Sequence, residues 1–272
     1  MTKNLFPQNQ MVAPEFDLKS IYQTVLKSVF TVFLLLCSMG VFGQIAISSS
    51  TPVTQNFNGT VTAPPVSLPA NWKMTAAGGG ANTWSDASNL TSANFTANSG
   101  TPTSGGRYNW GNGTTTTDRA IGFMTSGSYA SPNSIMAFYS NTSGVQINDL
   151  AISFDFERYR INTSDCSVTF FTSTNGTTWT ARTAGNSGAF STGSSAYDFN
   201  TGTVVNKSFT LTGINIPNGG NLYLRWNFDT FGASSQGVGL DNVSLTATLD
   251  GAAITSTQSG NWSSTSTWVG GV

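Results

Sequence analysis

Two carboxylates two residues apart are the feature of this 272-residue chain most suggestive of chemistry. Asp155 and Glu157 lie in the segment SFDFERYR, where the alternation of a β-strand would place both side chains on one face. Their carboxyl groups would then be roughly 6.5 to 7 Å apart, between the separations used by retaining and inverting glycoside hydrolases. The spacing therefore raises the hypothesis of acid/base chemistry on a sugar.

The residues around this pair argue against catalysis. The segment is similar to the E-x-D-x-E strand of laminarinase-type glycoside hydrolases, but Ser153 stands where the nucleophilic glutamate would be. Arg158 and Arg160 follow closely, and we expect them to neutralise the two acids in a structural network. We therefore predict no catalytic residue in this strand.

Histidine is absent from the chain, which excludes further enzyme classes. Without it, a Ser-His or Cys-His couple and a zinc site of the usual ligand types cannot form. Phosphate-cradling and nucleophile-elbow motifs are also missing. The net charge is −1 and no block of basic residues occurs, so neither nucleic acid nor an anionic membrane is an expected partner. We predict that the chain is not an enzyme.

Charged residues make up only 8% of the chain, and several stand inside apolar, strand-like runs. Alternation places Asp241 on the core-facing side of its segment, and Arg119 on the side of the apolar residues that follow it. A buried charge is costly unless it is paired. We therefore predict an ion pair between Arg119 and Asp241. The structural charge clamps expected in the chain are Asp118, Arg119, Glu157, Arg160 and Arg225.

A structural calcium ion is the alternative interpretation of Asp241. Calcium prefers oxygen ligands, and Asn56, Asn58 or backbone carbonyls of the first strand region could supply them beside this carboxylate. No other cofactor is expected.

Aromatic residues, at 12% of the chain, are the candidates for ligand binding. Trp84, Tyr108 and Trp110 flank long loops rich in Gly, Ser, Thr and Asn, where a flat ring could stay exposed and stack on a sugar. Core packing is the competing interpretation, because most tryptophans are largely buried.

The elements that would position these residues are all β-strands. Short alternating apolar runs are separated by turn signals such as Asn175-Gly176, and no long stretch keeps a helical period. This pattern predicts an antiparallel β-sandwich of jelly-roll type over residues 44–250. The expected strands are 53–57, 120–123, 135–139, 150–159, 168–172, 204–211, 222–228 and 240–248.

The two ends of the chain differ from this domain. Lys27 precedes a short apolar run that predicts a signal peptide within residues 1–43, with the mature chain beginning at Gln44. An uncleaved anchor is the alternative, and Met11 offers a second start site. Cys166 would then be the only thiol of the mature chain. Residues 251–272 resemble the start of a second, truncated β-domain.

In order along the chain, the segments LPANW, RYNWGNG, DRAIGF, FERYR, LYLRW and GLDNVSL resemble those of the N-terminal β-sandwich modules of large secreted proteins of the type IX (Por) secretion route. The closing GNWSSTSTWVGG resembles the start of adhesin-like repeat domains. The resemblance implies an accessory or adhesive module at the cell surface.

Three functions follow from these observations. The first is a non-catalytic extracellular module, secreted or on the cell surface, for adhesion or carbohydrate binding, with a glycan or surface polymer as partner. The second is the accessory domain of a secreted hydrolase, such as a glycoside hydrolase, nuclease or protease, whose catalytic domain lies beyond residue 272. The third is a structural spacer. No membrane contact is expected once the signal peptide is cleaved.

Overall fold

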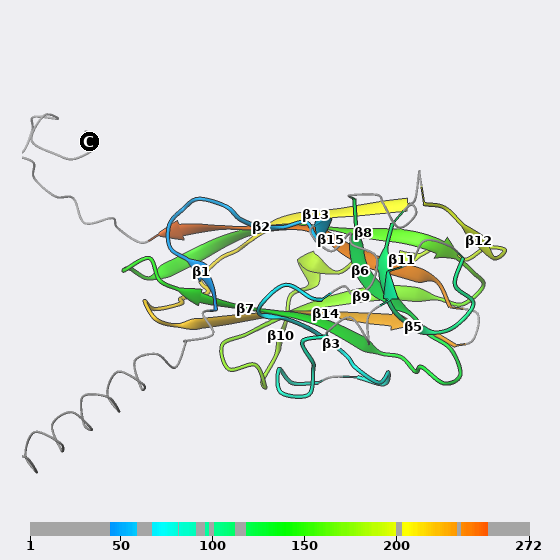
Figure 1. The fold of residues 1–272 in the computed structure, drawn as a ribbon. Helices are drawn as coiled ribbons and strands as arrows, with labels where there is room; N and C mark the ends of the chain where they lie inside the picture. Colours follow the sequence, from blue (N-terminus) through cyan, green and yellow to red (C-terminus); the bar gives the residue numbers. More distant parts are fainter. Residues whose placement is uncertain are drawn as a thin grey trace, which may run out of the picture. The chain divides into compact units, whose positions relative to one another are not determined.

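The computed structural model describes residues 44–58, 67–80, 82–90, 96–97, 101–111, 118–199, 203–232 and 235–249. They form two β-sheets that lie face to face, with β8, β13 and β15 in one layer and β7, β9 and β14 in the other (Figure 1). The all-β antiparallel sandwich of jelly-roll type expected from the sequence is confirmed. The predicted signal peptide and second β-domain lie outside the described residues. Within the described ranges, no helix is long and apolar enough to cross a membrane.

Sheet A has the strand order β1-β7-β14-β9-β10, with β3 beside β7 and β11 beside β9. All its pairings are antiparallel except that of β1 with β7. Its strands are β1 (Ile45–Ile47), β3 (Trp72–Met74), β7 (Asn133–Asn141), β9 (Cys166–Ser173), β10 (Thr180–Ala181), β11 (Ala189–Phe190) and β14 (Asn221–Thr230). The 3₁₀ turn η3 (Thr183–Gly185) follows β10.

Sheet B has the order β12-β8-β15-β6-β5-β4, with β13 beside β8 and β2 beside β15. Its pairings are antiparallel except that of β4 with β5. Its strands are β2 (Val53–Gln55), β4 (Thr96–Ala97), β5 (Gly106–Trp110), β6 (Ala120–Met124), β8 (Ile147–Ile161), β12 (Ala196–Tyr197), β13 (Thr203–Leu211) and β15 (Gly237–Leu249). Each of the eight strands expected from the sequence corresponds to one of the observed strands.

The core between the sheets is rich in aromatic rings. Trp72 and Trp226 of sheet A stack with ring centroids 5.7 Å apart, and Phe154 of sheet B meets Trp226 edge-on at 5.5 Å. Such pairs add about 0.5–1.5 kcal/mol each beyond the burial of their area. Cys166 is a buried free thiol at the start of β9. The aromatic contacts therefore join the two sheets where no disulfide is present among the described residues.

Strand β15 contains an irregularity that decides where Asp241 lies. Leu240 and Val243 are both members of the core cluster, although an unbroken strand would place them on opposite faces. The pairing of β15 with β8 shifts between Asp241 and Ser244, and Asn242 has a positive φ of 49°. This β-bulge reverses the alternation. The sequence prediction that Asp241 lies on the core-facing side of its strand is therefore wrong.

The outer face of sheet B carries a second, smaller cluster of rings. Trp110 stacks on Tyr159 with centroids 5.7 Å apart, and Tyr108 lies 4.7 Å from Trp110. Strand β15 makes room for the indole with a glycine: a Cβ on Gly237 would lie 2.7 Å from the Trp110 ring. The missing side chain therefore lets the tryptophan lie flat on the sheet.

Candidate functional site

Two of the three aromatics predicted to bind a ligand are buried. Trp110 has no exposed surface and Tyr108 is 7% exposed. Because both rings pack into the outer cluster of sheet B, the expectation that they stay exposed beside loops is wrong. Trp84 remains partly exposed, and a role in ligand binding stays a prediction for that residue alone.

Trp84 belongs to a group of aromatic and cationic side chains on the outer face of sheet A. The Lys73 ammonium lies 4.5 Å from the centroid of the Trp84 ring. The Arg225 guanidinium lies between the rings of Phe171 and Trp179, at 4.4 and 4.8 Å. Arg225 also donates a hydrogen bond to the carbonyl of residue 82 at 3.0 Å, and the Trp179 indole N–H donates to the same oxygen at 2.7 Å. These contacts hold the 82–90 loop against the sheet.

The buried ladder of rings on sheet B ends at a pocket. From Tyr159 the contacts continue to Phe199 at 5.9 Å, and Phe199 stacks on Tyr197 at 5.7 Å. The pocket has a volume of about 350 Å³. We call it the tyrosine pocket, and its lining residues are Arg158, Tyr159, Ile161, Ala196, Tyr197, Asp198 and Thr203.

Hydrogen bonds fix the polar wall of the tyrosine pocket. Arg158 donates from Nη1 to the carbonyl of Ser191 and from Nη2 to Oγ1 of Thr203, both at 2.8 Å. The hydroxyl of Tyr197 donates to the carbonyl of Pro102, and burial raises the pKa of this phenol. The tyrosine therefore stays neutral near pH 7 and is held in place by a contact made far along the chain.

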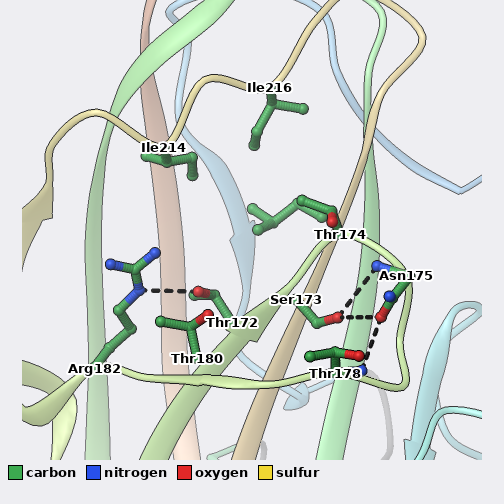
Figure 2. Close-up of a pocket in the computed structure, with 10 residues that line it drawn as sticks. Thr172, Ser173, Thr174, Asn175, Thr178, Thr180, Arg182, Ile214 and Ile216 are labelled. Atoms are coloured by element: carbon green, nitrogen blue, oxygen red, sulfur yellow. Dashed lines mark hydrogen bonds between the residues drawn. The ribbon is translucent and has the colours of Figure 1, made fainter.

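A second pocket lies at the edge of sheet A (Figure 2). Its volume is about 280 Å³, just below the range of about 300–1,000 Å³ that is usual for small-ligand sites. We call it the arginine pocket. Its lining residues are Thr172, Ser173, Thr174, Asn175, Thr178, Thr180, Arg182, Ile214, Ile216 and Leu222. One wall carries hydroxyl groups and Arg182, and the opposite wall is apolar.

Asp241 is fully buried, and among the described residues neither of its carboxyl oxygens has a hydrogen-bond partner. Burial raises its pKa to about 8. The backbone N–H of Asn242 lowers this pKa somewhat, although it completes no hydrogen bond. The negative charges of Glu157, Asp118 and Asp155 raise the pKa further. The predicted ion pair with Arg119 is therefore wrong. The bulge turns Asp241 toward other acids, because Asp155 lies directly opposite it on β8.

The predicted network of Asp155 and Glu157 with arginines is also wrong. Asp155 accepts hydrogen bonds from the side-chain amides of Asn206 at 2.7 Å and Asn242 at 3.0 Å, and Glu157 accepts one from Tyr159. Burial raises the pKa of Glu157, which the Tyr159 hydrogen bond partly offsets. The physical reason is the alternation of β8. It places the Arg158 side chain on the core-facing side of the strand, where its guanidinium lies over the Phe190 ring. The acids therefore find amide and phenol donors on the other face.

The remaining expected clamps act through hydrogen bonds and rings. Arg119 is fully buried, and its Nη1 donates to the carbonyl of Asn109 at 3.3 Å. Arg160 donates to the carbonyl of Ser235 at 3.2 Å and lies 5.5 Å from the ring of Tyr197. Asp118 is exposed. These arginines contact backbone carbonyls and a ring, and a role as structural clamps stays a prediction.

Asn56 and Asn58, the residues predicted to complete a cation site with Asp241, follow β2. Strand β2 pairs with β15 as far as Val243. In the segment that follows β2, Oδ1 of Asn58 accepts a hydrogen bond from the backbone N–H of Arg119 at 3.0 Å. Asn56 is exposed, and its Oδ1 accepts the N–H of Asn58 at 3.2 Å. Among the described residues, no group of three or more His, Cys, Asp or Glu side chains is placed to hold a metal ion. A cation bound by Asp241 would therefore need amide or backbone oxygens as well.

Sequence reasoning missed the two residues that define the pockets, Tyr197 and Arg182. Tyr197 lies in a polar Gly/Ser segment, where the alternating aromatics of AYDF indicate a short strand with one apolar face. For Arg182 no motif gives a signal, because the other wall of its pocket comes from residues more than thirty positions later in the chain.

No protein-family model matches the chain, and no curated protein matches it. Among solved structures, it is similar to the K1 cleaved adhesin domain of Lys-gingipain from Porphyromonas gingivalis W83, with 14% identity and a TM-score of 0.41 over 73% of this chain and 99% of that one. It is also similar to the K3 cleaved adhesin domain of the same protein, with 14% identity and a TM-score of 0.39 over 71% of this chain and 97% of that one. The similarity to TmCBM61 in complex with beta-1,4-galactotriose has 10% identity and a TM-score of 0.28 over 48% of this chain and 72% of that one.

Proposed function

We propose that the chain is a non-catalytic extracellular module that binds carbohydrate in the tyrosine pocket. The observation that carries the proposal is a partly exposed aromatic ring, Tyr197, beside fixed polar groups in a pocket of about 350 Å³. A sugar has an apolar face that stacks on a ring and a rim of hydroxyls that need donors and acceptors. This pocket offers both.

Other aromatic rings pack against the ring of Tyr197 and hold its orientation, which favours binding. Phe199 stacks on it and the ladder continues to Tyr159 and the buried Trp110. A ring held in one orientation loses little conformational freedom when a ligand stacks on it. Arg158, Thr203 and Asp198 stand at the rim as polar partners. Without histidine, and with Asp155 and Glu157 engaged by amides and a phenol, the module has binding groups and no catalytic set.

A glycan array on the full chain, followed by calorimetry with the best ligand, tests this function. Tyr197→Ala should weaken binding about five- to tenfold, the value of one aromatic stacking contact. Tyr197→Phe should retain most of the affinity because the ring remains. Phe231→Ala is the matched control, since Phe231 is 49% exposed and does not line the pocket. Unchanged affinity in Tyr197→Ala, or no glycan bound by the native chain, would overturn the proposal.

We also propose that Asp241 binds a structural Ca²⁺ with Asn58 and backbone oxygens near the end of β2. The support is a fully buried carboxylate whose two oxygens have no hydrogen-bond partner within the described ranges. A bound Ca²⁺ would supply the positive charge that no arginine supplies there. The ion would tie β2 to β15 and would have no part in glycan binding.

A secreted or cell-surface location completes the proposal. It is supported by the signal peptide expected within residues 1–43 and by the abundance of short polar side chains on the loops. In that setting, adhesion to a glycan-bearing surface and binding of a soluble glycan would use the same pocket.

A further inference from the structure

The arginine pocket has the chemistry of a second ligand site, separate from the tyrosine pocket. It opens between the β9–β10 hairpin and the 214–216 segment that precedes β14, and Figure 2 shows side chains from both sides directed into the space between them. None of its lining residues lines the tyrosine pocket. A ligand could therefore occupy one pocket independently of the other.

Arg182 is held in the pocket by its inner atoms and leaves its terminal nitrogens available. Its backbone N–H donates to the carbonyl of Phe170 at 2.8 Å, and its Nε donates to Oγ1 of the buried Thr172 at 3.0 Å. Nη1 and Nη2 make no hydrogen bond to any described residue, whereas Arg158 uses both of its terminal nitrogens. A guanidinium fixed in this way presents a flat pair of donors, which matches a carboxylate.

The charge around Arg182 is not neutralised within the pocket. No carboxylate is among the lining residues. Asp149, which contacts the adjoining loop, is already engaged, because its Oδ1 accepts the backbone N–H of Gly213 at 2.9 Å. An anionic ligand would therefore meet a positive group with no fixed negative charge on the walls.

The other walls match a sugar ring. Thr174, Thr178 and Thr180 contribute hydroxyls, which both donate and accept. Facing them, the half-buried Ile214 offers an apolar surface to the C–H face of a ring (Figure 2), whereas Ile216 is only 1% exposed. A pocket of about 280 Å³ limits the ligand to a small group, such as one sugar residue and part of its neighbour.

Both walls are held in place before any ligand binds. Oδ1 of Asn175 accepts hydrogen bonds from the Ser173 hydroxyl at 3.0 Å and from the backbone N–H of Thr178 at 2.8 Å, which fixes the hairpin turn. On the apolar side, the backbone N–H of Ile214 donates to the carbonyl of Asn148 at 2.8 Å. Preformed walls reduce the entropic cost of binding.

We propose that the arginine pocket binds the carboxylate-bearing residue of an acidic glycan, of the hexuronic acid class. The carboxylate would accept hydrogen bonds from Nη1 and Nη2 of Arg182, while the ring lies against Ile214. The inference adds a ligand class and a second site to the proposed function, and it rests on that function only in requiring that the module binds glycans.

The test is calorimetric titration of the full chain with three probes: trigalacturonic acid, its methyl ester, and the neutral galactose trisaccharide of the same linkage. The native chain should bind the acid at least tenfold more tightly than the ester. Arg182→Gln should abolish this preference, and Arg182→Lys should retain part of it through the charge alone. Lys207→Gln removes one positive charge from β13 in the other sheet and should leave the preference intact.

Each outcome separates this inference from the proposed function. If the acid and ester bind equally, or if Arg182→Gln keeps the preference, the acidic-sugar site is overturned while Tyr197-dependent binding of neutral sugars can still stand. Equal binding of a sulfated trisaccharide would overturn the assignment to carboxylates. If no sugar of any kind binds, both proposals fail. The melting temperature of each variant, compared with the native chain, shows whether the fold is retained.

Discussion

Asp241→Asn is the substitution that most directly tests how this fold accommodates a buried charge. In the absence of a bound cation, burial raises the pKa of Asp241 from 3.8 to about 8. The folded protein therefore holds a proton at pH values where the unfolded chain has released it. Below about pH 4 the side chain is neutral in both states, and the stability it permits is fully present. As the pH rises toward 8, that stability is lost.

The size of this effect follows from the pKa values. Each pH unit between 3.8 and 8 lowers the free energy of unfolding by about 1.4 kcal/mol, which gives a loss of roughly 5–6 kcal/mol by pH 8. Small domains are stable by about 5–15 kcal/mol in total. In chelator, the native chain should therefore be markedly less stable at pH 8 than at pH 5.

The assay is urea unfolding at pH 5, 6, 7 and 8, in EDTA and in millimolar Ca²⁺. Asn has nearly the same shape as Asp and no charge to ionise, so Asp241→Asn should show much less pH dependence over this range than the native chain, the remainder coming from Glu157, whose pKa burial also raises. Ca²⁺ should restore the native chain at pH 8, because it stabilises the ionised carboxylate, and should leave the variant unchanged. Asp165→Asn serves as a control, because Asp165 precedes β9 of the other sheet.

Two results would refute the reasoning. If the native chain in EDTA keeps the same unfolding free energy from pH 5 to 8, Asp241 does not titrate as its burial implies. If the native chain does lose stability with pH but Ca²⁺ has no effect, the carboxylate is buried without a cation and the calcium proposal is wrong.

Three further substitutions test the packing. Gly237→Ala should destabilise the domain by about 1–3 kcal/mol, because the new Cβ would lie 2.7 Å from the Trp110 ring. Gly127→Ala should be neutral, because nothing lies within 4 Å of its Cβ position. Equal urea midpoints for the two variants would contradict this expectation. Trp226→Ala removes a fully buried ring from the centre of the core and should cost about 3–5 kcal/mol in urea unfolding, and a loss below 1 kcal/mol would show that the core collapses around the site. Arg225→Gln should speed hydrogen exchange of the 82–90 loop, because it removes a guanidinium lying between two rings and a hydrogen bond to residue 82; unchanged exchange would mean that this contact does not hold the loop.

The core-facing residues of the long strands could be read from the sequence because alternation is a local property. In the expected strand 150–159, alternation places Ile152, Phe154 and Phe156 on one face, and all three are at most 1% exposed. The same rule failed at Asp241. A single residue with positive φ, Asn242, inserts a bulge and reverses the faces, and nothing in GLDNVSL distinguishes a bulged strand from a regular one.

The candidate sites were less predictable than the strands, because each is assembled from distant segments. Trp110 sits in a loop-rich, polar stretch of sequence and was expected to be exposed, yet Tyr159 from β8 and a glycine of β15 bury it. Tyr197 becomes a pocket wall through a hydrogen bond to Pro102, 95 residues earlier. Contacts at such separations leave no periodic pattern.

The sequence by itself determined the class of this protein: an all-β chain without histidine, with few charges and alternating apolar strands. Those conclusions depend on composition and on local backbone geometry. Only the tertiary structure decided which charges are paired, which rings are covered, and that Arg182 faces a pocket with its terminal nitrogens available. The physical reason is that burial and hydrogen bonding depend on which strands meet across the sheets and within each sheet, and strand pairing is a long-range property of the fold.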